Sequence, residues 1–303
     1  MSGNAPRAGS SSPFRRAIPS VLAIGAVLAV LTGIWYLVAI YYNTGYLSML
    51  HSEIGDIAQW NHLSMWQRWG QAVNSGSPEV PAPHQVISDL WGRLTEGTSV
   101  PGNLWVDLAT TSFEAVTGFV IGSIIAIVLA YLFVASRVIE LALFPYAVMS
   151  QTVPVIALVP ALVVILGVGY ESKIAIAAYL AFYPVTVSAV KGLRSVDVTA
   201  RELMRSYAAS SRQVLMKLRI PAALPYVFTG LKIGATASLI GAIVSELPAG
   251  SFYGLGVAIL GASSNHQNID LWATIIASGL LGLTLYLLVV AGERAVVRRR
   301  RAT

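Results

Sequence analysis

Six long apolar segments constrain the fold of this chain more than any other feature. An α-helix needs about 20 apolar residues to cross the hydrocarbon core of a bilayer. Charged residues make up only 11% of the chain, whereas soluble domains carry about 25%. The sequence therefore predicts an all-α integral membrane protein with six transmembrane helices. These helices are expected near residues 18–42, 115–136, 141–170, 174–190, 225–245 and 271–292.

The distribution of basic residues predicts the orientation of these helices. Lys and Arg accumulate in the short loops on the cytoplasmic side of a membrane protein. Most of the 20 basic residues lie in the N-terminal tail, in the loop 191–225 and at the C-terminus. Both termini and this loop are therefore predicted to be cytoplasmic. The same distribution accounts for the net charge of +6, so we expect lipid and not nucleic acid as the partner of the basic residues.

The composition divides the chain into five parts. The first apolar segment is longer than the ~7–15-residue core of a signal peptide and has no small-x-small cleavage site after it, so we interpret it as a retained helix. The expected parts are a disordered cytoplasmic tail (1–17), the first transmembrane helix (18–42), an external segment with amphipathic helices (43–108), a five-helix core (109–293) containing the loop 191–225, and a basic cytoplasmic tail (294–303).

The external segment has helical spacing of apolar and aromatic residues at 57–69. Trp and Tyr favour the head-group level of a bilayer, which is consistent with a helix lying on the outer membrane surface. A small packed external subdomain is the open alternative. A further short helix is expected at 85–94.

Several kinds of chemistry are missing from the sequence. The chain has no Cys, which excludes disulfides and thiolate metal sites. It has no Gly-Lys dipeptide, so it lacks the loop through which P-loop proteins bind ATP. The four histidines are scattered over predicted external segments, and we interpret them as solvated. No catalytic residue, metal site or cofactor is therefore expected; the histidines are His51, His62, His84 and His266.

The cytoplasmic loop contains two helix start signals. The Asp197 carboxylate is placed to cap a helix beginning at Val198. Ser210 and Gln213 have the spacing of a capping box, in which each side chain bonds the backbone of the other. We therefore expect two short helices that join at an angle near Ala209. Pro221 and Pro225 are expected to end the second helix before the fifth span.

A few polar residues lie near membrane depth. Glu246 closes the fifth span and is interpreted either as the lining of a pathway or as an interfacial carboxylate that touches water. Lys232 is expected to extend to the cytoplasmic surface. Gln151 lies beside the carbonyls freed by Pro154 and faces either a cavity or another helix. The candidate translocation residues are Gln151, Pro154, Ser245 and Glu246, while Gly118, Gly122 and Ser123 are expected to serve close helix packing.

The cytoplasmic loop resembles the EAA motif of permease subunits from binding-protein-dependent ABC importers. That pattern reads Glu-Ala-Ala, three residues, Gly, nine residues, Ile-x-Leu-Pro. Glu202 stands at the Glu position, and Leu218-Arg-Ile-Pro221 matches the end. Ala208 replaces the Gly, and because a residue with a Cβ disfavours positive φ, we expect a negative φ there.

The resemblance extends over about 81–301 and is similar to the nitrate/sulfonate/taurine branch, which includes permeases for thiamine pyrimidine precursors and riboflavin. It implies a type I importer permease in the bacterial plasma (inner) membrane, paired with a second copy of itself, with ABC ATPase subunits and with an external substrate-binding protein, periplasmic or lipoprotein. The implied ATPase-coupling residues are Glu202, Arg205, Ala208, Ala209, Ser210, Ser211, Arg212, Lys217 and Pro221. The segments that carry the similarity are 154–160, 182–184, 192–197, 229–232 and 253–256.

Three functional classes are compared: an importer permease, which the resemblance favours, an integral-membrane enzyme and an ion-driven transporter. For the importer, the expected substrate is either a sulfonate-, taurine- or nitrate-like anion or a neutral heteroaromatic. Only Lys232 approaches membrane depth as a cation, which slightly favours the neutral class. An integral-membrane enzyme would need a polar cluster at depth. An ion-driven secondary transporter would need acidic residues within the spans and often inverted repeats. The sequence shows neither.

Overall fold

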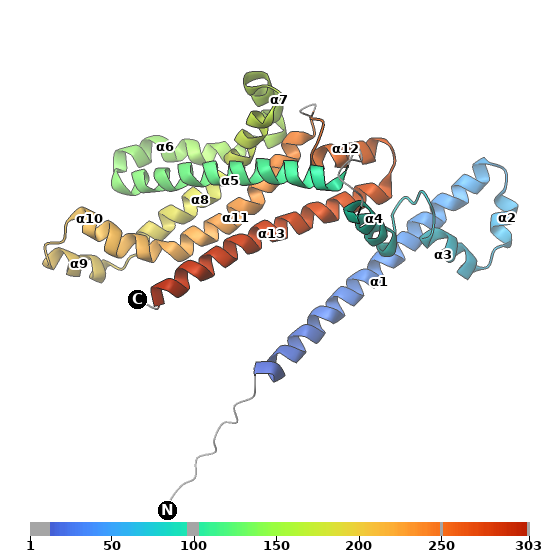
Figure 1. The fold of residues 1–303 in the computed structure, drawn as a ribbon, viewed down its shortest axis with the longest axis horizontal. Coiled ribbons are helices and arrows are strands. Elements are labelled where there is room, and N and C mark those ends of the chain that lie inside the picture. Colours follow the sequence, from blue (N-terminus) through green and yellow to red (C-terminus); the bar gives the residue numbers. More distant parts are fainter. Residues whose placement is uncertain (1–12, 96–102, 249–250, 302–303) are drawn as a thin grey trace, which may run out of the picture. The chain divides into compact units, whose positions relative to one another are not determined.

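The computed structural model describes residues 13–95, 103–248 and 251–301, and the elements found in these ranges are all helical (Figure 1). The chain divides into two compact units. One comprises the residues up to Asp89 together with His266–Trp272, and the other comprises Leu90–Asn265 and Ala273 onward. Five helices are long and apolar enough to cross a membrane, or six if one bent pair counts as a single span. The prediction of an all-α membrane fold is confirmed.

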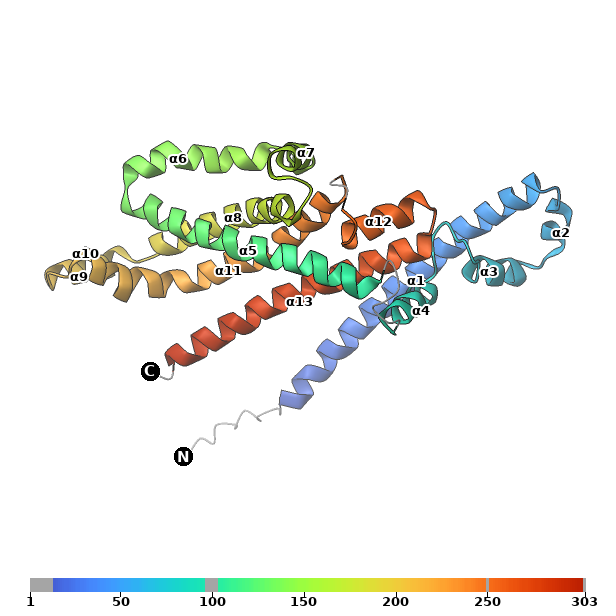
Figure 2. The same ribbon diagram turned by 45° about the horizontal axis from the view of Figure 1, so that its top comes forward.

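The larger unit is built around three long helices that lie side by side (Figures 1 and 2). They are α5 (Leu104–Ala135), α8 (Tyr170–Arg194) and α11 (Ile220–Glu246). Around them the chain forms α6 (Arg137–Met149), a 3₁₀ turn η1 (Ser150–Thr152), α7 (Val155–Leu166), α12 (Leu255–Ser264) and α13 (Asn268–Arg301). Residues 294–301 are thus the end of α13, where a separate basic tail was expected.

The third apolar segment does not form one straight helix. Its two halves, α6 with η1 and then α7, meet at 106°. Pro154 stands at the bend in an extended conformation, which suits a residue that lacks a backbone N–H and disfavours a helical residue before it. The chain leaves α7 through Gly167, which has φ +89. The structure therefore has a sharply broken span or a re-entrant pair here.

Small residues bring the three central helices close together. A Cβ added at Gly118 of α5 would lie 2.4 Å from Ala177 Cβ and 2.8 Å from the carbonyl oxygen of Ile174. A Cβ at Gly122 would lie 2.5 Å from the carbonyl oxygen of Ala178. Gly241 of α11 approaches the other side of Ala177 in the same way. Gly118 and Gly122 therefore serve helix packing, as the sequence predicted, and Gly241, which was not predicted, does so too.

The smaller unit contains α1 (Pro13–Glu53), α2 (Ile57–His62), α3 (Met65–Val73) and the start of α4 (Pro83–Thr95). Asn43 of α1 is buried, and its amide donates hydrogen bonds to the carbonyl oxygens of Ala72 and Val80, both at 2.9 Å. Trp60 of α2 is buried against His51. Because α2 and α3 fold back onto the end of α1, the structure favours the packed external subdomain.

Two boundary expectations changed in this unit. The helix α1 already begins at Pro13, so residues 13–17 are not the disordered end of a tail. The remainder of that predicted tail, residues 1–12, lies outside the described residues. The helix α4 covers the short helix expected at 85–94.

Replacing Gly118 by Ala should destabilise the protein by about 1–3 kcal/mol, because the new methyl group overpacks the contact with α8. The matched control is Gly33→Ala on α1, where nothing lies within 4 Å of the added Cβ. That change should be neutral or stabilising by up to about 1 kcal/mol, since Gly weakens a helix relative to Ala. Thermal unfolding of both variants in mild detergent measures the difference. Equal midpoints would contradict the close-packing argument.

Candidate functional site: an exposed loop and a buried polar network

The loop 191–225, which was predicted to couple to the ATPase and is called the coupling loop below, contains two short helices, α9 (Val198–Ser206) and α10 (Ser211–Val214). The Asp197 carboxylate accepts a hydrogen bond from the Thr199 N–H at 3.3 Å. Ser210 and Gln213 form the complete capping box, with distances of 2.8 and 3.3 Å. Both start signals are therefore confirmed, and the helix is interrupted between Ser206 and Ser211 as expected. Most predicted coupling side chains are exposed: Glu202, Arg205, Ala208, Ser210, Ser211, Arg212 and Lys217.

The corner between the two helices is a Schellman motif. The N–H of Ala208 donates to the Arg205 carbonyl at 2.9 Å, and the N–H of Ala209 donates to the Met204 carbonyl at 3.0 Å. The motif requires a left-handed residue after the helix, and Gly usually fills that position. Ala208 has φ +52, so the expectation of a negative φ was wrong. The two hydrogen bonds hold Ala208 in a conformation that its Cβ disfavours.

Beyond the corner, the chain runs as one continuous helical segment from Ser211 to Glu246. A π-helical segment, η2 (Leu215–Arg219), joins α10 to α11, and the N–H of Ile220 bonds the Leu215 carbonyl. Pro221 and Pro225 lie within this run, so the prediction that they end the helix was wrong. A proline interferes with the carbonyl four residues earlier, and the wider π turn just before Pro221 accommodates this interference.

The far end of α11 carries a buried polar network, which we define as Asp107, Thr111, Glu114, Lys173 and Glu246 with residues 254–256. In these three residues the loop after α11 enters α12, and they are called the loop 254–256 below. Glu246 is 1% exposed. Its carboxylate accepts the Thr111 hydroxyl at 2.6 Å and the Gly256 N–H at 2.5 Å. Thr111 in turn accepts the N–H of Leu255 at 2.9 Å. One of the two expectations for Glu246 was an interfacial carboxylate that touches water. Its burial contradicts that expectation.

Three more charged side chains, Lys173, Glu114 and Asp107, complete this network from neighbouring helices. The Lys173 ammonium of α8 lies 3.5 Å from a Glu114 carboxylate oxygen of α5, and both side chains are buried. Asp107 accepts the N–H of Gly254 at 2.8 Å. No acidic residue was expected within a span, and the second span was expected to begin only after Glu114. In the structure α5 begins at Leu104, so Asp107 and Glu114 belong to this apolar helix, and Glu246 is the last residue of α11. Hydropathy counts charges along one helix and misses partners on another.

The two glycines of Tyr253-Gly-Leu-Gly256 leave room for the Glu246 side chain. Gly254 has φ +132, and a Cβ there would lie 2.4 Å from the Glu246 carboxyl carbon. A Cβ at Gly256 would lie 2.3 Å from the carbonyl oxygen of Ile243. Glycine at both positions lets the backbone approach Glu246 this closely, and the Gly256 N–H donates to its carboxylate.

The other predicted residues occupy separate places. Gln151 is exposed at the α6–α7 bend, beside Pro154. Ser245 is buried, and its hydroxyl donates to the Ala242 carbonyl at 2.7 Å. Lys232 pairs with Glu293 of α13 at 2.5 Å, so it does not extend freely to lipid phosphates as expected.

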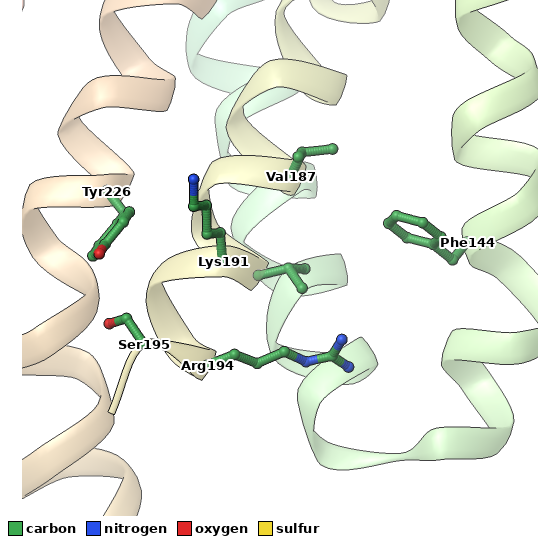
Figure 3. A pocket seen from close by; sticks show the side chains of 7 residues that line it. Phe144, Val187, Lys191, Arg194, Ser195 and Tyr226 are labelled. Atoms are coloured by element: carbon green, nitrogen blue, oxygen red, sulfur yellow. The ribbon is translucent and has the colours of Figure 1, made fainter. Parts of the chain in front are cut away.

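A cavity of about 540 Å³ opens between α6, α8 and α11. Figure 3 shows Lys191 and Tyr226 on neighbouring helices at one side and Phe144 at the other. Arg194, also in its wall, is neutralised by Glu140 at 2.7 Å, and Glu140 further binds Arg137 at 2.8 Å. Within the described ranges Lys191 has no ion pair, so it is the cation that this cavity presents.

This arrangement defines the class of the protein: it is a multi-span helical membrane protein in which an exposed, capped corner continues into a spanning helix. Residues 118–302 match the family described as the binding-protein-dependent transport system inner membrane component. Similar proteins include a probable ABC transporter permease protein of Haemophilus influenzae, 33% identical over 74% of this chain and 88% of the relative. The riboflavin transport system permease protein RibX of Chloroflexus aurantiacus is 33% identical over 78% and 86%. The putative aliphatic sulfonates transport permease protein SsuC of Bacillus subtilis is 28% identical over 79% and 85%.

The chain belongs to this family of ABC importer permeases. It is a multi-pass protein of the bacterial inner membrane and a transport component of a binding-protein-dependent importer. The family in general works with ATPase and substrate-binding subunits.

Replacing Lys173 by Met should destabilise the protein by about 3–5 kcal/mol, because it leaves buried carboxylates without their cation. The double variant Lys173→Met/Glu114→Met should recover a large part of that loss. Arg137→Met is the control, since its side chain is 71% exposed and such pairs contribute about 0–1 kcal/mol. Thermal unfolding of the four proteins in detergent checks this. A double variant no more stable than Lys173→Met would refute the pairing.

Replacing Ala208 by Gly should strengthen the corner by about 1 kcal/mol, since Gly adopts the left-handed conformation without the Cβ penalty. Ala209→Gly is the control, because its φ is not positive and the change should weaken the corner. Hydrogen exchange of the amides in residues 203–214 reports the local opening. Slower exchange in Ala209→Gly than in Ala208→Gly would count against the strained corner.

Proposed function

We propose that the coupling loop receives the ATPase subunits and that the helix from Ser211 to Glu246 carries their movement into the membrane. The observation behind this proposal is the unbroken helical run that begins at the Ser210 cap and ends in the buried network. At about 1.5 Å per residue, such a helix spans the bilayer with length to spare. A push at its exposed end therefore moves its buried end as part of one rigid element.

The corner supplies the contact for this push. Glu202, Arg205, Arg212 and Lys217 present charges around it, and all are exposed. The tight turn at Ala208 makes a narrow projection that fits a cleft of a soluble partner. In this scheme Ala209, Ser210 and Ser211 enter the cleft, and Pro221 marks the start of the spanning part of the helix. Both termini lie on the same cytoplasmic side as the corner.

At the opposite end, the network holds α5, α8 and the loop 254–256 against α11. A movement of α11 is transmitted to these elements because the buried charges cannot be separated from their partners cheaply. Ser245 and Glu246 then act at the pathway by positioning α11, while Gln151 and Pro154 line it at the exposed α6–α7 bend. A second copy of the chain completes the pathway, and an external binding protein delivers the solute.

The substrate is a small solute of one of two classes. Relatives are named for riboflavin, formylaminopyrimidine, aliphatic sulfonates, bicarbonate and nitrate. Lys173 and Lys232 are both paired with carboxylates, which supports a neutral heteroaromatic over a sulfonate-, taurine- or nitrate-like anion. The cation of Lys191 in the 540 Å³ cavity supports the anion. Proteoliposomes with the cognate binding protein, assayed with each ligand class, separate the two.

An ion-driven transporter also carries acidic residues within its spans, but the carboxylates buried here are held by hydrogen bonds and by Lys173. The two classes differ in their energy source. Uptake into proteoliposomes should require ATP and the ATPase subunits. Uptake driven by an ion gradient alone would instead support the secondary transporter.

A cysteine placed at Ser211 should cross-link to the ATPase subunit, which tests the docking directly. The chain has no native Cys, so each introduced thiol is unique. The control is Ser264→Cys at the end of α12, which is equally exposed and lies outside the coupling loop. In intact cells, a membrane-impermeant thiol reagent should label position 264 and spare position 211. Labelling of position 211 from outside, or cross-linking from position 264, would overturn the proposed orientation.

A further inference from the structure

A cavity of about 890 Å³ lies between the last turn of α5 and the coupling loop. Tyr131, Val134 and Ala135 form its wall on α5, and residues of α9, α10 and η2 form the rest. Because α5 is a spanning helix, its last turn lies at the level where the membrane meets water. The cavity therefore opens at the membrane surface on the side of the coupling loop.

The charge of this cavity is strongly unbalanced. Four arginines line it, Arg201, Arg205, Arg212 and Arg219, against the single carboxylate of Glu202. In the part of the chain that the structure describes, none of the four guanidinium groups has an ion pair. Arg201 and Arg219 also line a neighbouring cavity of about 340 Å³. Unpaired guanidinium groups gathered around one space repel each other, and an anion between them removes that repulsion.

The π-helical segment contributes to the same wall. Leu215, Met216 and Arg219 all belong to η2 and all line the cavity. A π turn changes the register of the side chains that follow it, and such turns occur often at functional sites. Here it brings Arg219, which is half-buried, into the wall shared with Arg201.

Apolar side chains occupy the remainder of the lining, among them Val134, Val198 and Met216. A freely soluble phosphate makes no apolar contact with this surface, whereas a phospholipid has both a charged head group and an apolar part that can cover it. Arg binds phosphate through paired hydrogen bonds from its planar fork. Basic pockets at the cytoplasmic surface are known to take anionic head groups.

We propose that this cavity binds the phosphate of an anionic phospholipid from the cytoplasmic leaflet, with Arg201 and Arg219 as its main contacts. The proposal rests on the cytoplasmic orientation in the proposed function, but not on the docking of the ATPase. The lipid would hold the coupling loop against the end of α5. An acidic segment of a partner protein is the competing occupant, so the test uses the permease alone.

The experiment measures the thermal midpoint of the purified permease in neutral detergent as a short-chain phosphatidylglycerol is added. Short-chain phosphatidylcholine and glycerol 3-phosphate are the comparison ligands. Phosphatidylglycerol should raise the midpoint at a lower concentration than either comparison ligand does. In Arg201→Gln/Arg219→Gln its apparent affinity should fall about tenfold or more, because charge-assisted hydrogen bonds are lost. Arg294→Gln/Arg298→Gln removes the same charge from exposed positions on α13 and should bind as the wild type does.

Three results would overturn the proposal. Equal affinity in both double variants would mean that the lipid binds elsewhere. Equal effects of glycerol 3-phosphate and phosphatidylglycerol would assign the cavity to a soluble anion. Equal effects of phosphatidylcholine and phosphatidylglycerol would show that net charge is irrelevant.

Two further arms keep the outcome interpretable. If the Gln variant does not fold, Arg201→Lys/Arg219→Lys keeps the charge but removes the planar fork, and it should still weaken binding. Cross-linking from position 211 reports the proposed docking separately. A failed cross-link with intact lipid binding would reject the docking alone, and the reverse result would reject the lipid site alone.

Discussion

The structure of the larger unit depends on keeping a buried charge partnered. A carboxylate taken from water into a low-dielectric interior loses solvation worth several kcal/mol, and only close donors and cations recover it. Glu246 recovers it through the Thr111 hydroxyl and the Gly256 N–H, and Glu114 through Lys173. Each of these partners comes from a different element. The requirement therefore helps to fix α5, α8, α11 and the loop 254–256 relative to one another.

The same requirement explains where small residues are needed. Gly254 and Gly256 allow the backbone to reach the Glu246 carboxylate, and Gly118 and Gly122 allow α5 to reach α8. Without the close helix contact, Lys173 would not reach Glu114, because the two residues sit on different helices. Packing and electrostatics are thus one constraint in this region. A change in the helix packing therefore alters the contacts of the buried charges, and a change in those charges alters the packing.

The sequence predicted what local rules determine and missed what depends on distant partners. The length of the apolar segments predicted the spans, and the spacing of Ser210 and Gln213 predicted the capping box. Glu114 looked like a span boundary because its cation, Lys173, lies on another helix. Pro221 looked like a helix end because the π turn that accommodates it has no sequence signal of its own. Ala208 looked incompatible with a left-handed turn because propensity alone cannot weigh the two hydrogen bonds that hold it there.

One helical run joins the strained corner at Ala208 to the charged network at Glu246. The corner is held at a disfavoured φ by two backbone hydrogen bonds, so loss of these bonds would release it from the left-handed conformation in one step. The network resists gradual deformation, because stretching a buried ion pair costs more with each ångström while its groups stay out of water. A helical run between such a corner and such a network is expected to move as a whole. Discrete rearrangement, and not gradual bending, is therefore the motion that this architecture favours.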